Sequence, residues 1–158
     1  MIEKIISGAQ TGADRAALDV ALELGIPCGG WVPKGRLAED GPIPAHYPNL
    51  AETPVSAVEM RTEWNIRDSD ATLILSHGPL DGGSLYTRIK AEELGKHWRH
   101  IDLSKTGIEQ ASESVKRWLT EVHPRILNVA GPRASKDPFI YEKTCELLRR
   151  LFRQYPSS

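Results

Sequence analysis

Three times along this chain, an apolar run rich in β-branched residues leads into a glycine-bearing turn and then into a segment with helical periodicity. The runs occupy residues 2–7, 71–76 and 126–130. A strand that ends in such a turn points free backbone N–H groups, and the positive end of the next helix dipole, toward an anion. The carboxyl ends of parallel strands meet at one edge of a sheet. The repeated unit therefore predicts one anion-binding site that several turns build together.

Length and charge exclude several classes of protein. The 158 residues suit one domain, 1–158. The net charge of −1 disfavours nucleic-acid binding, which rests on a basic surface. No apolar run approaches the roughly 20 residues that cross a bilayer, and the first residues enter a strand rather than a signal peptide. We expect a cytoplasmic protein with no membrane partner, in which Cys28 and Cys145 are buried, reduced thiols.

Strands and helices are predicted to alternate along the chain, and the strands show little polar alternation. This pattern is typical of an α/β fold, a mostly parallel sheet with helices on both faces. The predicted strands are 2–7, 26–32, 71–76, 98–103 and 126–130. The predicted helices are 12–24, 58–67, 84–95, 108–122 and a last one that starts at Pro138, with Asp137 as its N-cap, and carries Tyr155.

Residues 33–56 differ from the rest, because five prolines interrupt any regular element there. We expect a long, ordered loop. Lys34 in this loop is a candidate to meet a phosphate group. Trp31 and Trp64 are candidates to stack on a base or a pterin, and core packing is the alternative for each.

The first turn, Ser7-Gly-Ala-Gln-Thr-Gly-Ala-Asp-Arg15, combines glycines at 8 and 12 with the polar side chains of Gln10 and Thr11. The alternative is a tight strand-to-helix turn with no ligand, in which Thr11 and Asp14 form a capping box. The carboxylate of Asp14 would repel an anionic ligand. Three alternatives are open: it caps the helix, it accepts a hydrogen bond from a ribose hydroxyl, or its charge is offset by Arg15. The turn matches neither the Rossmann nor the Walker glycine pattern.

The second and third turns offer further donors. Gly82, Gly83, Ser84 and Thr87 follow the run 71–76, and a capped turn is the alternative interpretation. The third turn supplies a guanidinium and a hydroxyl from the residues Gly131, Arg133 and Ser135, although Arg133 could equally be a solvated loop residue. Arg61 and Asn65 share one helix face, so they could point toward the ligand together or pair with neighbouring acidic residues.

Several long strings occur together in this chain: Ser7-Gly-Ala-Gln-Thr-Gly-Ala-Asp-Arg-Ala16, Gly29-Gly-Trp-Val-Pro-Lys-Gly-Arg36, Ala38-Glu-Asp-Gly-Pro-Ile-Pro44, Arg61-Thr-Glu-Trp-Asn65 and Asp68-Ser-Asp-Ala-Thr-Leu73. With these motifs the chain resembles the putative molybdenum carrier family, the circularly permuted YpsA-like branch of the SLOG superfamily. The resemblance implies a Rossmann-like three-layer α/β sandwich that binds a nucleotide or a nucleotide-derived ligand such as the molybdenum cofactor, whose pterin carries a phosphate. It also implies a circular permutation, since residues 126–136 look like the element that begins unpermuted relatives.

The same superfamily contains phosphoribohydrolases that cleave a base from ribose 5′-phosphate, and this chain is similar to them only in part. Arg61 and the pair Gly82-Gly83 match their signature, whereas Thr62 replaces a lysine and Leu85-Tyr86 interrupt a Gly-Thr. No carboxylate stands at the matched position, although such a reaction needs one near the developing positive charge. We therefore expect binding, with nucleotide hydrolysis at an N-glycosidic or phosphate bond as the alternative.

The histidines are scattered and no cysteine stands at metal-ligand spacing from one, so no protein-bound metal and no required cofactor are expected. The expected partners are a small phosphorylated ligand, with the molybdenum cofactor or a nucleotide as candidates, and, on the resemblance alone, a second copy in a homodimer. The predicted ligand-binding residues are Gly8, Gln10, Thr11, Gly12, Asp14, Arg15, Lys34, Arg61, Asn65, Gly82, Gly83, Ser84, Thr87, Gly131, Arg133 and Ser135.

Overall fold

A central sheet of six parallel strands organises this protein, for which a computed structural model describes residues 2–153. Tyr155, expected on the last helix, lies outside these residues. The sheet strands are β1 (Lys4–Ile6), β2 (Cys28–Val32), β5 (Leu50–Glu52), β6 (Ala71–Ser76), β7 (His97–Asp102) and β8 (Ile126–Ala130). Their order across the sheet is β5-β2-β1-β8-β6-β7, and every neighbouring pair is parallel.

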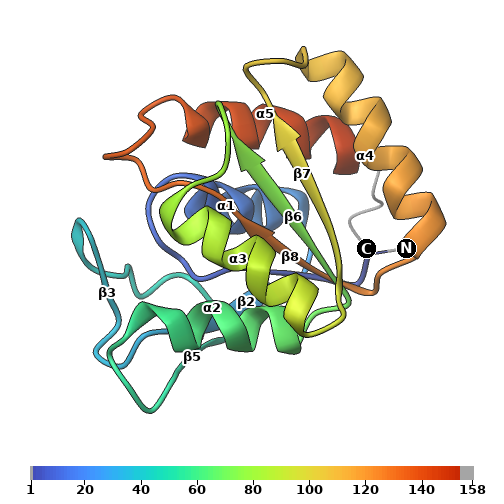
Figure 1. The fold of residues 1–158 in the computed structure, drawn as a ribbon. Coiled ribbons are helices and arrows are strands. Elements are labelled where there is room, and N and C mark those ends of the chain that lie inside the picture. The colour runs from blue at the N-terminus through green and yellow to red at the C-terminus, as the bar shows by residue number, and fades with distance from the viewer. Residues whose placement is uncertain (1, 154–158) are drawn as a thin grey trace.

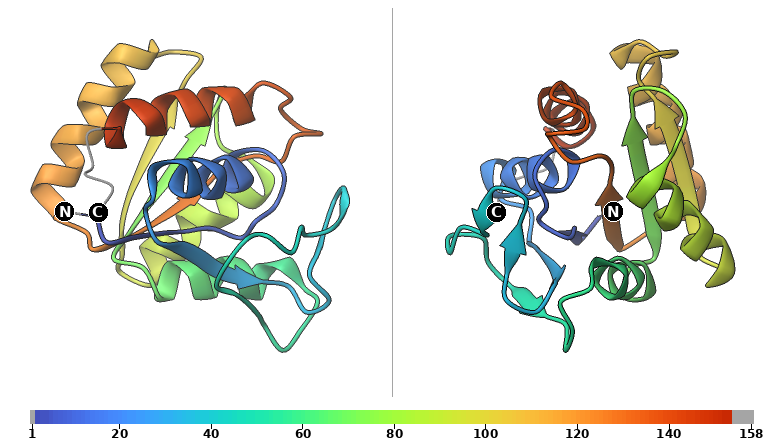
Figure 2. Two further views of the ribbon diagram at one scale, coloured as in Figure 1. Left: turned by 180° about the vertical axis from the view of Figure 1, so that it is seen from behind. Right: turned by 60° about the vertical axis from the view of Figure 1, so that its left-hand side comes forward.

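Five helices connect and cover these strands: α1 (Ala13–Leu24), α2 (Val58–Arg67), α3 (Gly82–Glu93), α4 (Ile108–Val122) and α5 (Ile140–Phe152). Helices α1, α4 and α5 pack on one face of the sheet, and α2 and α3 pack on the other (Figures 1 and 2). The expected Rossmann-like three-layer α/β sandwich is confirmed. No helix in the described part of the chain combines the length and the apolar character needed to span a membrane.

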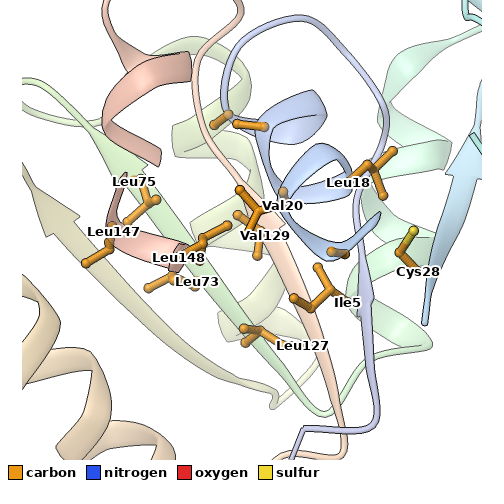
Figure 3. Close-up of a cluster of buried hydrophobic side chains, with 14 of the residues drawn as sticks. Ile5, Leu18, Val20, Cys28, Leu73, Leu75, Leu127, Val129, Leu147 and Leu148 are labelled. Atoms are coloured by element: carbon orange, nitrogen blue, oxygen red, sulfur yellow. The ribbon is translucent and has the colours of Figure 1, made fainter. Parts of the chain in front are cut away.

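Burial follows the place of each strand in the sheet. All six residues of β6 are buried, because helices cover this inner strand on both faces. The edge strand β7 instead alternates between exposed and more buried residues. Figure 3 shows how Leu73, Leu127 and Ile5 of three neighbouring strands meet Val20 of α1 and Leu148 of α5 in one apolar core.

The segment 33–56 contains more regular structure than its prolines predict. A two-stranded hairpin, β3 (Leu37–Ala38) with β4 (Gly41–Pro42), stands apart from the main sheet. Strand β5 then pairs with β2 and forms one edge of the sheet. Its three residues are only partly buried or exposed, so no apolar pattern in the sequence marks it.

The predicted caps of two helices are wrong. Helix α1 begins at Ala13 with Gly12 as its N-cap residue and no side-chain cap, so Thr11 and Asp14 do not form a capping box. Helix α5 begins at Ile140, and the Asp137 carboxylate accepts a hydrogen bond from the Phe139 N–H, one residue before the helix. The pair Gly82-Gly83, expected in the preceding turn, instead forms the first residues of α3.

The turn after β1 and the loop after β8 are held together by a very close backbone contact. A Cβ atom on Gly131 would lie 2.6 Å from the Ala13 Cβ and 2.6 Å from the Leu75 carbonyl oxygen. Gly12, at φ 83°, would overlap the Pro132 carbonyl oxygen in the same way. The Ala13 N–H donates to that oxygen at 3.3 Å. Glycine at these positions therefore allows α1, β6 and the β8–α5 loop to meet.

We expect Gly131→Ala to lower the free energy of unfolding by about 2 kcal/mol, because the added methyl group would force these backbones apart. Urea denaturation of the purified variant measures this loss. Gly107→Ala is the matched control, since a Cβ there meets nothing within 4 Å and its φ is −66°. Equal stability of the two variants would contradict the close contact at Gly131.

Candidate functional site

A cavity of about 520 Å³ lies beyond the carboxyl ends of β1, β8 and β6, three neighbours at the centre of the sheet. Its wall contains residues of all three glycine-bearing turns, among them Gly8, Gly83 and Gly131. The turns meet here because their strands are parallel and adjacent, so that all three chains leave the sheet at the same edge. Helix α2 closes one side with Arg61, Thr62 and Asn65.

Most of the predicted ligand-binding residues line this cavity, although the structure does not bring all of them together there. The cavity wall contains Gly8, Gln10, Asp14, Arg61, Asn65, Gly82, Gly83, Ser84, Thr87, Gly131 and Arg133. Thr11, Gly12, Arg15, Lys34 and Ser135 do not line it. Residues outside the predicted set also do, including Glu39, Glu59, Asp81, Tyr86, Asn128 and Lys136. Of these, Lys136 could have been found from its place in the third turn, two residues before a helix signal.

The N-terminus of α3 presents unused donors to the cavity. Within residues 2–153, the N–H groups of Gly82, Gly83 and Ser84 have no hydrogen-bond partner, and the first bond of this helix runs from the Leu85 N–H to the Asp81 carbonyl oxygen at 3.1 Å. A Cβ on Gly83 would meet nothing within 4 Å, and one on Gly82 would meet only the Lys136 ammonium at 3.1 Å, so the space beside Gly83 is open and the neighbouring group is a cation. The Thr87 hydroxyl donates to the Gly83 carbonyl oxygen at 2.9 Å and points back along the helix. This end of the helix is suited to an anion.

The first turn differs, because the carboxylate of Asp14 already occupies it. The N–H groups of Gln10, at 3.4 Å, and of Gly8 donate to Asp14. Arg15 opposes this charge only from a distance, since its guanidinium binds the carboxylate of Asp40 and the carbonyl oxygen of Ala9 while its charge still lowers the pKa of Asp14. The first turn therefore holds an anion of its own chain where a ligand phosphate was expected.

Asp14 is itself electrostatically unusual. Its side chain lies at the cavity wall and the residue is only 8% exposed. Burial raises the pKa of this carboxyl to about 6, and the nearby guanidinium of Arg61 and the donated N–H groups only partly oppose that effect. A carboxyl with this pKa is partly protonated close to neutral pH.

Arg61 reaches the cavity through the space that Gly8 leaves open. A Cβ on Gly8 would overlap the Arg61 side chain, whose Nη1 donates to the Gly8 carbonyl oxygen at 2.9 Å and lies 3.9 Å from Asp14 Oδ2. The buried Nε of Arg61 has no hydrogen-bond partner in the part of the chain that the structure describes. A buried guanidinium with an unused donor is a group that an anionic ligand would satisfy.

The two tryptophans contact each other away from the cavity, and the side chain of Asn65, which lines the cavity, binds the Trp31 backbone. The Asn65 amide accepts from the Trp31 N–H at 2.8 Å and donates to the Trp31 carbonyl oxygen at 3.0 Å, which ties α2 to β2. The rings of Trp31 and Trp64 meet edge to face with centroids 4.7 Å apart. Trp31 Nε1 also donates to the Asp68 carboxylate at 2.7 Å. Neither ring lines the cavity, so the expected stacking on a ligand is not supported.

The remaining predicted residues have other places. Lys34 is exposed, and its backbone N–H donates to the Val55 carbonyl oxygen, outside the cavity wall. Gly12 packs against the third turn. Thr11 and Ser135 both donate to the carboxylate of Glu39, which covers them. Among residues 2–153, no group of three or more His, Cys, Asp and Glu side chains is arranged to hold a metal ion.

Comparisons with known proteins agree with the resemblance carried by the sequence motifs. The circularly permutated YpsA SLOG family matches residues 5–152. The chain is also similar to a crystal structure from Syntrophus aciditrophicus SB, named a putative molybdenum carrier protein, with 54% identity and a TM-score of 0.94. That match covers 96% of this chain and 95% of the other. No curated protein sequence matches this chain.

The raised pKa of Asp14 predicts a pH dependence of stability. The folded chain holds a proton on Asp14 up to about pH 6, whereas the unfolded chain releases it near its ordinary value of 3.8. Wild-type protein should therefore lose stability, relative to Asp14→Asn, as the pH rises from about 4 to about 6. Urea denaturation at several pH values gives the free energy of unfolding of both proteins. We expect the stability advantage of Asp14→Asn over wild type to grow by up to about 3 kcal/mol over this interval.

Asp102→Asn is the control for this titration. Hydrogen bonds, first from the Ser104 hydroxyl, lower the pKa of Asp102 to about 2. Its contribution to stability is therefore lost at low pH and is constant between pH 5 and 7. A stability difference for Asp14→Asn that stays flat between pH 4 and 7 would contradict the raised pKa.

Proposed function

Because this chain belongs to the circularly permutated YpsA SLOG family, we propose that its cavity binds a nucleotide or a phosphorylated, nucleotide-like cofactor. The observation that carries this proposal is the open N-terminus of α3, where three N–H groups have no partner within residues 2–153. A phosphate group bound there gains these donors and the favourable end of the helix dipole.

The size and polarity of the cavity support a ligand of this class. A volume of about 520 Å³ falls within the range of roughly 300–1,000 Å³ that is usual for small-ligand sites. Arg61, Arg133 and Lys136 place positive charge in its wall. Arg61 supplies the buried guanidinium, and its unused Nε is one of the few buried polar atoms in the described chain without a partner.

The molybdenum cofactor is the cargo that the similar protein's name suggests. The residues of this cavity fit its phosphate end, through the N-terminus of α3 and the guanidinium of Arg61. The dithiolene of the pterin holds the metal in such a cofactor, so a carrier needs no ligand cluster of its own. In this proposal the protein holds the cargo and shields it, and no bond is made or broken.

One observation favours a second function, hydrolysis of a nucleotide at its N-glycosidic bond. Asp14 lies at the cavity wall with a pKa of about 6, which suits a group that gives and takes protons near neutral pH. In this alternative Asp14 would stabilise the positive charge that develops on the ribose, or would activate water.

The compartment and the assembly remain predictions. Cys28 and Cys145 are free and buried, and burial raises the pKa of both thiols, which supports the proposal of a reducing compartment such as the cytoplasm. The homodimer rests on the family resemblance, and light scattering with and without ligand would test it.

Gly83→Val should abolish binding of nucleoside monophosphates while leaving the protein folded. The branched side chain would occupy the phosphate position, yet the free space around Gly83 leaves the protein itself without a clash. Isothermal titration with adenosine 5′-monophosphate and with inorganic phosphate measures the loss, and circular dichroism checks the fold.

Gly107→Val is the matched control, because Gly107 also stands at a helix N-terminus with open space around it but does not line the cavity. We expect this variant to bind as wild type does. Full affinity in Gly83→Val would exclude the N-terminus of α3 as the phosphate site.

Incubation with nucleoside monophosphates, followed by chromatography, separates the two functions. For a binding protein we expect no free base and no inorganic phosphate above the uncatalysed background. Steady release of free base that Asp14→Asn abolishes would replace binding by hydrolysis as the function.

A further inference from the structure

Glu39, between the two short strands of the β3–β4 hairpin, binds a set of donors that comes from distant parts of the chain. Its Oε1 accepts from the Thr11 hydroxyl at 2.7 Å and from the Ser135 N–H at 3.0 Å. Its Oε2 accepts from the Ser135 hydroxyl at 2.6 Å and lies 3.3 Å from Arg133 Nε. Two carboxylate oxygens thus receive three hydrogen bonds and one ion pair, the kind of environment that a phosphate group also prefers.

The position of Glu39 explains why two predicted residues are missing from the cavity wall. Glu39 lines the cavity, whereas Thr11 and Ser135, which donate to it, do not. The carboxylate therefore lies between the cavity and these donors. Hydrogen bonds from Ser135 and Thr11 hold the pKa of Glu39 below its usual value, so the group that covers them is an anion.

The hairpin that carries Glu39 is held to the body of the molecule by polar contacts and not by strand pairing. Strands β3 and β4 pair only with each other and not with the main sheet. Figures 1 and 2 show the hairpin projecting from the body of the molecule. Besides the Glu39 side chain, the Asp40 carboxylate holds it to Arg15, and the Glu39 backbone N–H donates to Gln10 Oε1 at 2.9 Å. Withdrawal of the Glu39 side chain would therefore break none of the strand pairs of the main sheet.

The loop that carries donors of Glu39 also reaches the N-terminus of α3, through Lys136. Lys136 follows Ser135 in the third turn, and its Nζ lies 3.1 Å from the position that a Cβ on Gly82 would take. The same ammonium pairs with the Asp81 carboxylate at 2.5 Å. Lys136 thus brings a positive charge from the third turn to the N-terminus of α3.

This inference rests on the proposed phosphate site at α3. We infer that Thr11, Arg133 and Ser135 form a second anion subsite. The Glu39 carboxylate fills this subsite until a ligand with a second phosphate group displaces it. The ligand class is accordingly one with two linked phosphate groups, such as a nucleoside diphosphate or a diphosphate-bridged dinucleotide. The first phosphate binds at α3 and the second takes the place of Glu39.

Isothermal titration with inorganic pyrophosphate and inorganic phosphate tests this inference. Glu39→Ala removes the competing anion and should raise the affinity for pyrophosphate about tenfold, the change that 1.4 kcal/mol produces. Phosphate should bind wild type once per chain and Glu39→Ala twice. Adding Ser135→Ala to Glu39→Ala should remove the gain in pyrophosphate affinity.

Glu39→Gln, which keeps the size of the side chain, should give a smaller gain in pyrophosphate affinity. This variant provides the test if the alanine variant does not fold.

Glu113→Ala is the charge control, since it removes one negative charge from the exposed surface of α4, outside the cavity wall and away from the hairpin. It should leave pyrophosphate binding unchanged. An equal gain in Glu113→Ala, or no gain in Glu39→Ala and Glu39→Gln while wild type binds phosphate, would overturn the second subsite alone. Absence of any phosphate or pyrophosphate binding in wild type and in all variants would overturn both this subsite and the proposed function.

Discussion

The close contact between the start of α1 and the end of β8 is the constraint on which the cavity depends. Gly131 and Gly12 bring the backbones of the first and third turns together, and the carbonyl of Leu75 at the end of β6 limits the same contact. Because β1, β8 and β6 are adjacent and parallel, this contact fixes where each of the following segments starts. The glycines of the first and third turns therefore serve the packing of the chain on itself, whereas Gly83 faces open space.

Charge is distributed around the cavity in an equally specific way. Asp14 satisfies the N–H groups of the first turn, and Glu39 satisfies the donors of the third. The N-terminus of α3 has no such internal partner within residues 2–153. Carboxylates supplied by the chain thus serve as acceptors for donors of the first and third turns.

The sequence predicted the layers of the fold well, because buried parallel strands and amphipathic helices leave strong local patterns. It predicted the convergence of the turns from topology alone. It could not reveal that Glu39, distant in sequence, covers Thr11 and Ser135, since no local pattern encodes that contact. Strand β5 was missed because it is short and mostly exposed. The sequence left ligand stacking and core packing open for Trp31, because its ring partner on α2 is apparent only in three dimensions.

The place of β8 in the sheet has a consequence for how the protein matures on the ribosome. This strand lies between β1 and β6, yet it is the last of the strands to be synthesised. Until it emerges, β1-β2-β5 and β6-β7 are two separate strand groups, and the edges of β1 and β6 that pair with β8 in the finished sheet are open. The nascent polypeptide must keep both edges from pairing wrongly, and the arrival of one late strand joins them into a single sheet.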